Sequence, residues 1–420
     1  MKTALRSGAL ALAVATIAAA PAPLARHRAT GTIAASAIAY FPGSALQIGV
    51  DGFPGPYGFA VIGQGTVAGG LYRLPLQADP GGATLLAASA AGLAAAQLRI
   101  AAAPGPDRTL IAVASYDDGV AVHDAGSFRA LGILGTAGSP SDVAFTPGGR
   151  LAATDTQGDA ITVATLRPWS VARVAGVPLG DEIAVDPETN AIFVTDRGGG
   201  DAGELTRIAA DGAVAHVATG ATAEGLAIDA RHGIVYVANV NDDTVAAVDA
   251  ATMRLRERFK AVARVFALAL STDGSLLYAV SNQSASSPFG APGRVVAIAL
   301  RGKPRVVARS ADLAFPVGIA LDASLHRLFV TDEERDRIDV LDARTLRSVH
   351  APLPTCRTPW KPSFDPVGDR LYVPCARADR VDVYDARTLA RVRGAPFATG
   401  GYPLAVAVWH PAARAKHPSS

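Results

Sequence analysis

The sequence is poor in features that would point to several classes of protein. Only 18% of its 420 residues are charged, and 39 Lys and Arg stand against 37 Asp and Glu without any run of basic residues. Nucleic-acid-binding proteins usually carry such a basic patch, so no nucleic-acid partner is expected. The sequence also lacks the CxxCH, HExxH and GxSxG motifs of haem attachment, zinc peptidases and α/β-hydrolases.

Long apolar runs are missing as well, since a membrane-spanning helix needs about 20 apolar residues. One shorter run, Ala9 to Ala20, follows Lys2 and Arg6 and precedes Ala-Pro-rich sequence. This order of basic, apolar and small residues is typical of a secretory signal. We therefore expect a signal peptide at 1–25, a periplasmic or secreted protein, and no membrane span beyond this leader. A retained membrane anchor is the alternative.

Glycine and proline are abundant, with 42 and 28 residues, and they punctuate a repeated unit. The unit reads GIVYVANVNDDTVAAVDAAT at 233–252, and its spacing returns at 327–346 and 370–389. It predicts a strand, a polar turn, a second strand and an Asp-containing turn. We expect the last Asp of each copy to accept hydrogen bonds from the backbone of that turn. These residues are Asp249, Asp342 and Asp385.

Strands that match the first half of this unit occur along most of the chain. Successive copies are mostly 41 to 43 residues apart, with two steps of 51. Short strands at this period predict a β-propeller blade. We expect an all-β propeller at 58–411 with eight four-stranded blades, or seven, because the first copy is degenerate. The eight strands are 58–63, 109–115, 150–155, 191–196, 234–239, 276–281, 327–332 and 370–375.

The two ends of the propeller are expected to meet. The segment YPLAVAVWH at 402–410 resembles a first strand, whereas the copy at 58–90 lacks one. The C-terminal strand would complete the opening blade and remove exposed sheet edges; closure by residues 33–50 is the alternative. Residues 26–57 are expected to be a linker or irregular segment, and 412–420 a disordered tail.

The repeat resembles the YVTN family of propellers, which belongs to the lactonase-like propeller superfamily. Tyr-Val-Ala-Asn at 236–239 is one substitution from Tyr-Val-Thr-Asn, and variants stand at 193–196, 329–332 and 372–375. The resemblance covers about residues 95 to 410. It implies a propeller fold, but the relatives include surface-layer and periplasmic proteins as well as enzymes, so it implies no single activity.

Carboxylate and amide side chains are frequent where strands meet the expected ligand-binding face of the ring. Such oxygen ligands suit Ca²⁺ or Mg²⁺. Glu224, in AEGLAID, also resembles the Glu-Gly strand of gluconolactonase-type propellers, in which a Glu and its partners hold a divalent metal. The hypothetical metal ligands are Glu224, Asn239, Asp196 and Asp332. Residues that solvate the face and cap turns are the alternative interpretation.

Four further residues are candidates for contacts with a ligand at the same face: Asp155, Glu182, Trp360 and Tyr402. We expect an exported binding or scaffold protein with a small molecule or protein partner at this face. No cofactor is certain, although Ca²⁺ or Mg²⁺ would fit the carboxylates. The alternative function is a divalent-metal-dependent lactonase or a related hydrolase or lyase.

The two cysteines flank a predicted hairpin. The turn is Asp365-Pro-Val-Gly-Asp369, and counting outward from it brings Cys356 and Cys375 to the same end of the two strands. Cysteines of an exported protein meet an oxidising compartment. We therefore predict a disulfide between them, with two buried free thiols as the alternative.

Overall fold

A computed structural model describes residues 29–33, 39–47, 50–51, 57–68, 71–89, 92–105, 107–198, 202–284, 286 and 290–411. The expected signal peptide at 1–25 and the expected tail at 412–420 lie outside these residues. The chain forms two compact units. The first includes residues up to Pro104 together with Leu131–Gly138, and the second includes Gly105–Ala130 and the chain from Ser139 onward. No helix in the described ranges has the length and hydropathy to span a membrane.

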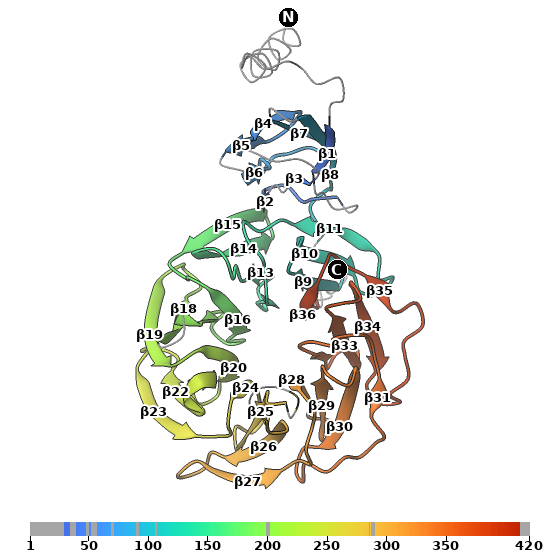
Figure 1. The fold of residues 1–420 in the computed structure, drawn as a ribbon. Coiled ribbons are helices and arrows are strands. Elements are labelled where there is room, and N and C mark those ends of the chain that lie inside the picture. Colours follow the sequence, from blue (N-terminus) through green and yellow to red (C-terminus); the bar gives the residue numbers. More distant parts are fainter. Residues whose placement is uncertain are drawn as a thin grey trace, which may run out of the picture. The chain divides into compact units, whose positions relative to one another are not determined.

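Four-stranded sheets form a ring (Figure 1), and all of their strands lie in the second unit except most of β11. We number these sheets as blades 1 to 7, each given from its first strand outward. Blade 1 consists of β36 (Pro403–Trp409), β9 (Leu110–Ser115), β10 (Gly119–Asp124) and β11 (Ala130–Leu134). Blade 2 consists of β12 (Val143–Phe145), β13 (Arg150–Ala153), β14 (Ala160–Leu166) and β15 (Trp169–Ala175). Blade 3 consists of β16 (Gly180–Val185), β17 (Ile192–Asp196), β18 (Gly203–Ile208) and β19 (Val214–Gly220).

The remaining blades have the same order. Blade 4 is β20 (Ala223–Asp229), β21 (Ile234–Asn239), β22 (Thr244–Asp249) and β23 (Leu255–Lys260); blade 5 is β24 (Val265–Leu270), β25 (Leu276–Ser281), β26 (Arg294–Ala299) and β27 (Arg305–Arg309); blade 6 is β28 (Pro316–Asp322), β29 (Arg327–Asp332), β30 (Arg337–Asp342) and β31 (Leu353–Pro354); blade 7 is β32 (Ser363–Asp365), β33 (Arg370–Cys375), β34 (Arg380–Asp385) and β35 (Phe397–Ala398).

The first strands of the blades lie next to the centre of the ring (Figure 1). Each contacts the first strand of the following blade, and the C-terminal strand β36 contacts both β32 and β12. It also pairs with β9 along its whole length. The C-terminal strand therefore lies between the last and the second blade, at the position of a first strand.

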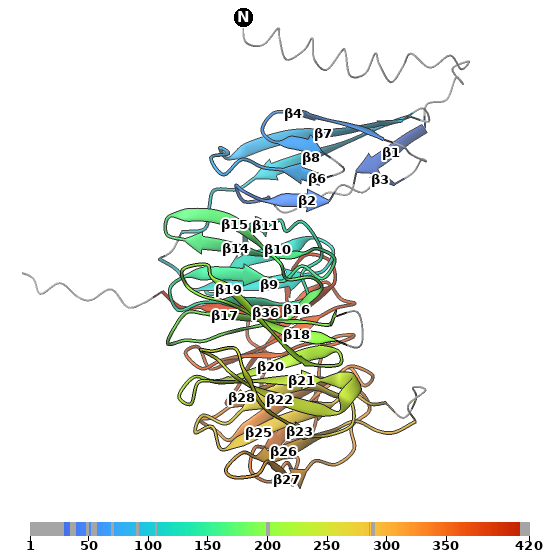
Figure 2. The ribbon, with the colours of Figure 1, turned by 90° about the vertical axis from the view of Figure 1, so that its left-hand side faces the viewer.

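Burial decreases from the centre of a blade to its rim. Every residue of β9 and β17 is buried, because neighbouring blades cover both faces of these strands. The outermost strand β27 instead alternates exposed and half-buried residues, the pattern of a strand with one packed face. Figure 2 shows strands β16 to β23 of blades 3 and 4 from the side.

The predicted turn chemistry is present. The Oδ1 atoms of Asp249, Asp342 and Asp385 each accept a hydrogen bond of 2.8 Å from the backbone N–H of the Thr three residues later. These Asp residues therefore cap the turns between the third and fourth strands of their blades, as expected from the repeat.

The expected count of eight blades is not confirmed, because the described residues form seven four-stranded sheets. The copy expected at 58–90 belongs to the first unit. Its strands β4 (Gly58–Ile62) and β7 (Gly81–Ser89) join a different, five-stranded sheet. The C-terminal strand consequently completes the blade of β9, one copy later than the sequence suggested. The apolar segment GFAVIG at 58–63 thus forms a strand, as expected, but not a strand of a blade.

The first unit contains two sheets of its own. The five-stranded sheet has the order β3 (Val50–Asp51), β1 (Ala29–Ile33), β8 (Gly92–Ile100), β7 and β4, with β1 parallel to β8; the three-stranded sheet has the order β2 (Ala45–Gln47), β6 (Leu71–Arg73) and β5 (Thr66–Ala68). The range 26–57, expected to be a linker, thus contains strands β1 to β3. Burial of Tyr72 raises the pKa of its phenol to about 12, and this hydroxyl donates to the carbonyl of Gln64 at 2.6 Å.

Candidate functional site at the centre of the ring

A β-bulge interrupts the first strand of most blades at its beginning. In blade 4 the register shifts between Ala223 and Leu226, so that Glu224 and Gly225 oppose one residue of β21. The same shift occurs in blades 1, 3, 5 and 6. A bulge redirects the side chains of the extra residues and is frequent near functional sites. We call the two residues at this place in each blade its bulge pair.

The bulge pairs differ in chemistry around the ring. Blade 3 has Asp181 and Glu182, and blade 4 has Glu224 and Gly225. The equivalent residues of blade 2, just before β12, are Ser141 and Asp142. Blades 5, 6, 7 and 1 instead place an apolar residue first: Phe266 with Ala267, Val317 with Gly318, Trp360 with Lys361, and Leu404 with Ala405.

Lys361 links opposite parts of the ring. Although it belongs to blade 7, its Nζ lies 2.6 Å from Oδ2 of Asp142 in blade 2 and 3.1 Å from Oε2 of Glu182 in blade 3. Asp142 Oδ2 also accepts the backbone N–H of Ile183 at 2.9 Å, and Glu182 Oε2 accepts that of Leu226 at 3.2 Å. The ammonium group and these backbone donors together fix the two carboxylates.

Arg197 forms a second cationic bridge beside the first. It follows β17 and lies 2.9 Å through Nη2 from Oδ1 of Asp181 and 2.8 Å through Nε from Oε1 of Glu224. Both carboxylates are buried, whereas the guanidinium side chain is 47% exposed. The two bridges place four carboxylates against two cations, which leaves an excess of negative charge at the centre.

Burial and mutual repulsion change the protonation of these groups. The pKa of Glu224 is raised well above its ordinary value, first by burial and then by the charge of Asp181 and a hydrogen bond to it. Burial also raises the pKa of Glu182, although Lys361 opposes this shift. Burial alone would lower the pKa of Lys361, but the charges of Asp142 and Glu182 outweigh it and raise the pKa. The site therefore combines a charged ammonium group with carboxyl groups that retain protons above their usual range.

An aromatic corner lies on the apolar side of the centre. The rings of Phe266 and Trp360 meet edge to face, with centroids 6.4 Å apart and an interplanar angle of 85°. Both side chains are only half-buried. A Cβ on Gly225 would lie 2.3 Å from the carbonyl oxygen of Phe266. Neighbouring first strands approach so closely that small residues are required at the second place of some bulge pairs.

The residues expected at the ends of the second strands have a different role. Asp332 accepts the backbone N–H groups of Ala314 and Phe315 at 3.0 and 3.1 Å, and Asn239 donates to the carbonyl of Thr219 at 3.3 Å. The Asp332 contacts tie β29 to the loop that precedes the first strand of the same blade, and the Asn239 contact ties β21 to β19, the last strand of blade 3. These polar residues satisfy backbone groups of neighbouring segments.

The other two residues of this type bind loops that follow their strands. Asp196 accepts the backbone N–H of Gly198 at 2.7 Å. Asp155 accepts that of Gln157 at 3.2 Å and forms an ion pair with Arg173, also at 3.2 Å. Burial raises the pKa of both carboxyls. Like Asp332, they are engaged within their own blades.

The hypothetical metal ligands do not converge. Among the His, Cys, Asp and Glu residues that the structure describes, donor atoms mutually within 4.8 Å occur in a single group of three, Cys356, Cys375 and Asp382. Glu224, Asp196 and Asp332 are not part of it, and Glu224 is occupied by Arg197. Ca²⁺ and Mg²⁺ take six or more oxygen ligands, and these three carboxylates form no such cluster among the described residues.

Among the expected ligand contacts, Glu182 and Trp360 belong to bulge pairs, whereas Tyr402 lies just before β36. The Tyr402 ring meets that of Tyr116 at 6.3 Å, and its N–H donates to Asp379 at 3.0 Å. The sequence interpretation missed Asp142, Asp181, Arg197 and Lys361. An alignment of the first strands would have placed three of them in bulge pairs, but Arg197 lies outside the strands.

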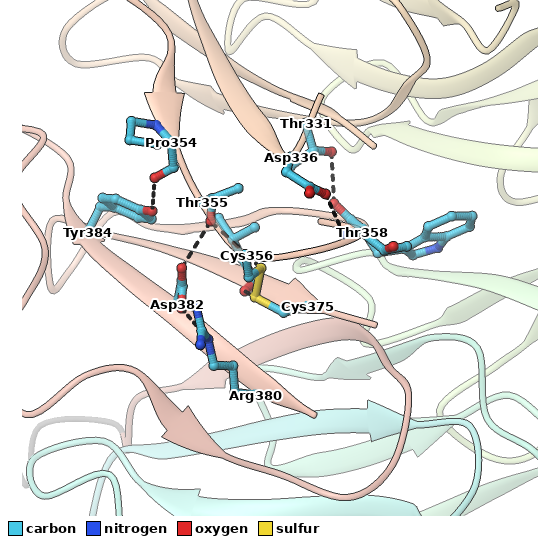
Figure 3. The surroundings of a disulfide bond; sticks show 12 residues. Thr331, Asp336, Pro354, Thr355, Cys356, Thr358, Cys375, Arg380, Asp382 and Tyr384 are labelled. Carbon is cyan, nitrogen blue, oxygen red and sulfur yellow. Dashed lines mark hydrogen bonds and ion pairs between the residues drawn. A yellow bond between two sulfur atoms is a disulfide. The ribbon is translucent and has the colours of Figure 1, made fainter. Parts of the chain in front are cut away.

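The predicted disulfide is present between Cys356 and Cys375, with a Cα–Cα distance of 5.6 Å (Figure 3). Cys375 ends β33, as Asp332 ends β29, and Cys356 lies in the loop that precedes the first strand of blade 7. The disulfide therefore replaces, by a covalent bond, the hydrogen bonds that Asp332 forms in blade 6.

The ring of four-stranded sheets defines a β-propeller, and comparisons with solved structures agree. The chain resembles the periplasmic gluconolactonase PpgL of Pseudomonas aeruginosa, with a TM-score of 0.58, 15% identity, and coverage of 71% of this chain and 98% of that one. It also resembles hydrazine synthase of Kuenenia stuttgartiensis, with a TM-score of 0.58, 16% identity, and coverage of 69% and 94%.

A third similar structure is Sqt1 of Saccharomyces cerevisiae, with a TM-score of 0.54, 15% identity, and coverage of 71% of this chain and 84% of that one. No protein-family model matches the sequence, and no curated protein matches it. Proteins with unrelated names share this fold, so the likeness establishes the propeller and leaves the function to the site.

Proposed function

We propose that the protein is an exported binding protein whose ligand or partner site lies at the centre of the ring. The observation that carries this proposal is the cross-ring contact of Lys361 with Asp142 and Glu182, which brings charged groups of three blades together. Structural blades need no such convergence, because their own hydrogen bonds and apolar contacts satisfy them.

The two sides of the centre suit a small molecule that carries both polar and apolar groups. Carboxyls, Lys361 and Arg197 offer hydrogen bonds and charge, while Phe266 and Trp360 offer half-buried aromatic surface. Binding sites for small molecules commonly combine apolar walls with a few fixed polar groups. A segment of a partner protein with the same chemistry would fit the same description.

Export is supported by the disulfide, because disulfides persist mainly in oxidising compartments. The sequence of residues 1–25, with its basic and apolar parts, agrees with this expectation. We infer a periplasmic or secreted location and a place among YVTN-type propellers.

Ligand-dependent thermal stability tests the binding proposal. Full-length protein would be screened against small molecules that carry both a charged and an aromatic group. A ligand that raises Tm for the wild type should lose at least tenfold in affinity with Trp360→Leu and keep it with Val307→Ala, on the exposed rim of blade 5. Equal binding by both variants for every ligand found would contradict a central site.

The alternative is a divalent-metal-dependent lactonase or related hydrolase or lyase. One observation favours an enzyme: Arg197 joins the buried carboxyls of Asp181 and Glu224, and burial raises the pKa of Glu224. Buried carboxyls with a raised pKa are frequent among general acids and bases. Hydrolysis of simple lactones with Ca²⁺, Mg²⁺ or chelator, compared between wild type and Glu224→Gln, tests this alternative. Activity in the wild type that the substitution abolishes would favour it.

A further inference from the structure

The disulfide of blade 7 lies against a buried carboxylate. The donor atoms of Cys356, Cys375 and Asp382 are mutually within 4.8 Å, and these residues are 3%, 0% and 0% exposed. In β33 and β34, Cys375 is opposite Arg380 and Val373 is opposite Asp382. Cys375 and Asp382 are therefore diagonal neighbours on one face of the sheet.

We propose that cleavage of this disulfide turns the same three residues into a site for a thiophilic divalent cation such as Zn²⁺. Thiolates and carboxylates are both ligands of Zn²⁺, with bonds of about 2.0 to 2.3 Å, and three protein ligands leave the fourth position to water. In a tetrahedron, such bonds separate the donors by about 3.3 to 3.8 Å. After the disulfide is cleaved, the two sulfur atoms must move apart to this separation, whereas a carboxylate oxygen of Asp382 already lies within 4.8 Å of both.

The loop that carries Cys356 stays anchored without the disulfide. Thr355 donates its N–H to the carbonyl of Asp336 at 3.0 Å, and Thr358 donates to the Asp336 carboxylate at 2.8 Å (Figure 3). These hydrogen bonds hold the loop on both sides of Cys356. The two thiols would consequently remain near each other after reduction, so the cost of ordering the ligands is low.

The surroundings of Asp382 already resemble the outer shell of a metal site. Its Oδ1 lies 2.9 Å from Nε of Arg380, and its Oδ2 lies 2.9 Å from Nη1 of Arg391 and accepts the Thr355 hydroxyl at 3.1 Å. Carboxylates that bind metals are commonly oriented by such contacts. Two thiolates and the carboxylate would supply three negative charges, which balance the divalent cation and part of the charge on the two arginines.

The chemistry requires a reductant, for which we name a trialkylphosphine. The phosphine and one water convert the disulfide into two thiols and a phosphine oxide, so phosphorus is oxidised as sulfur is reduced. The cation then displaces one proton from each thiol and forms two metal–sulfur bonds. Disulfide and metal are thus mutually exclusive occupants of the site.

The test uses full-length protein, reduced by the phosphine, freed from it without air, and titrated with Zn²⁺ or Co²⁺. Reduced protein should bind one equivalent of Zn²⁺ and release about two protons, since each thiol must ionise to bind. Co²⁺ should give sulfur-to-metal charge-transfer absorption. Oxidised protein and the Cys356→Ser/Cys375→Ser variant should show neither. Binding no tighter after reduction than before it, or equal binding by the double variant, would overturn the proposal.

Asp382 has a matched control in the preceding blade. Arg337 and Asp339 of blade 6 form the same pair as Arg380 and Asp382, at 3.0 Å, but without cysteines beside them. Asp382→Asn should weaken Zn²⁺ binding by the reduced protein at least about tenfold, and Asp339→Asn should leave it unchanged. Equal affinity in Asp382→Asn would overturn the three-ligand site. Should Asp382→Asn fail to fold, the proton count and the Co²⁺ spectrum of the wild type still decide whether both thiols bind.

Discussion

All seven blades share one backbone arrangement, but two groups of neighbouring blades supply opposite chemistry to the centre of the ring. Blades 2, 3 and 4 form the acidic side, and blades 5, 6, 7 and 1 form the apolar side. The first group carries carboxylates in its bulge pairs, and the second carries Phe266, Val317, Trp360 and Leu404. The strand pairing satisfies the backbone in both groups, so these side chains are free to vary without changing the fold. Lys361 is the exception, because it starts on the apolar side and ends among the carboxylates. The residues that recur in every blade thus account for the ring of sheets, and the bulge-pair residues that differ between blades form the candidate site.

Removal of the C-terminal strand should destabilise the apolar side of the ring more than any other change. Deleting 402–420 removes β36 and Leu404 and leaves the ladder edge of β9 unpaired. We expect loss of cooperative unfolding, or a protein that no longer accumulates in folded form, because first strands on both sides lose their neighbour. Deleting only 412–420 is the control. Thermal unfolding by circular dichroism measures both, and equal curves for the two deletions would show that β36 is dispensable.

The link between the two sides can be broken by Lys361→Met. This change leaves the buried carboxylates of Asp142 and Glu182 without their shared cation, which we expect to cost about 3 kcal/mol in the free energy of unfolding. Urea unfolding at pH 7 measures it. Lys303→Met, at an exposed position between β26 and β27, should change stability by less than about 0.5 kcal/mol.

A second substitution distinguishes a charge effect from lost packing. Adding Glu182→Gln to Lys361→Met should recover part of the loss, because one uncompensated carboxylate is then removed. No recovery in the double variant would show that the aliphatic stem of Lys361, and not its charge, stabilises the centre.

The apolar side also has a covalent tie that the acidic side lacks. The Cys356–Cys375 bond closes a loop with a sequence separation of 19 residues, and in the chain-entropy model such a loop contributes about 3 kcal/mol. Replacing both cysteines by serine should lower the free energy of unfolding by about that amount. Thiol labelling of denatured, unreduced wild type should find no free cysteine. Two reactive thiols would contradict the disulfide.

The sequence predicted those parts of the molecule that local patterns determine. The period of the strands, the Asp-capped turns and the disulfide follow from residues close together in the chain or in one hairpin. The rim strands gave no such signal: β23 reads LRERFK, with most residues exposed, so neither face carries an apolar pattern. The segment 58–63 misled the blade count because it forms a strand, β4, that joins the five-stranded sheet of the first unit and no blade.

The centre of the ring could not be predicted in the same way. Lys361 and Asp142 are 219 residues apart, and no local pattern relates them. Glu224 was correctly placed on a first strand near the centre, but its guanidinium partner comes from a loop after a different strand. Whether such side chains meet depends on the number of blades and on the bulge that orients each bulge pair. Neither could be predicted from the sequence.

The smallest expected effect concerns the protonation of the acidic side. The folded pKa of Glu224 is raised above its ordinary value of 4.5, first by burial and then by Asp181. Between 4.5 and the folded pKa, the native state binds more protons than the unfolded state, so stability falls as the pH rises through this window. The free energy of unfolding of Glu224→Gln should match that of the wild type near pH 4, where Glu224 and its Gln replacement are both neutral. It should decrease less than that of the wild type as the pH increases. Urea unfolding from pH 4 to pH 8 measures the two slopes, with Glu257→Gln on the exposed strand β23 as the control. Because Arg197 compensates part of the negative charge once Glu224 ionises, we expect the slopes to differ modestly. Identical slopes would mean that Glu224 titrates normally in the folded protein, and the acidic side would then differ from the apolar side in polarity alone.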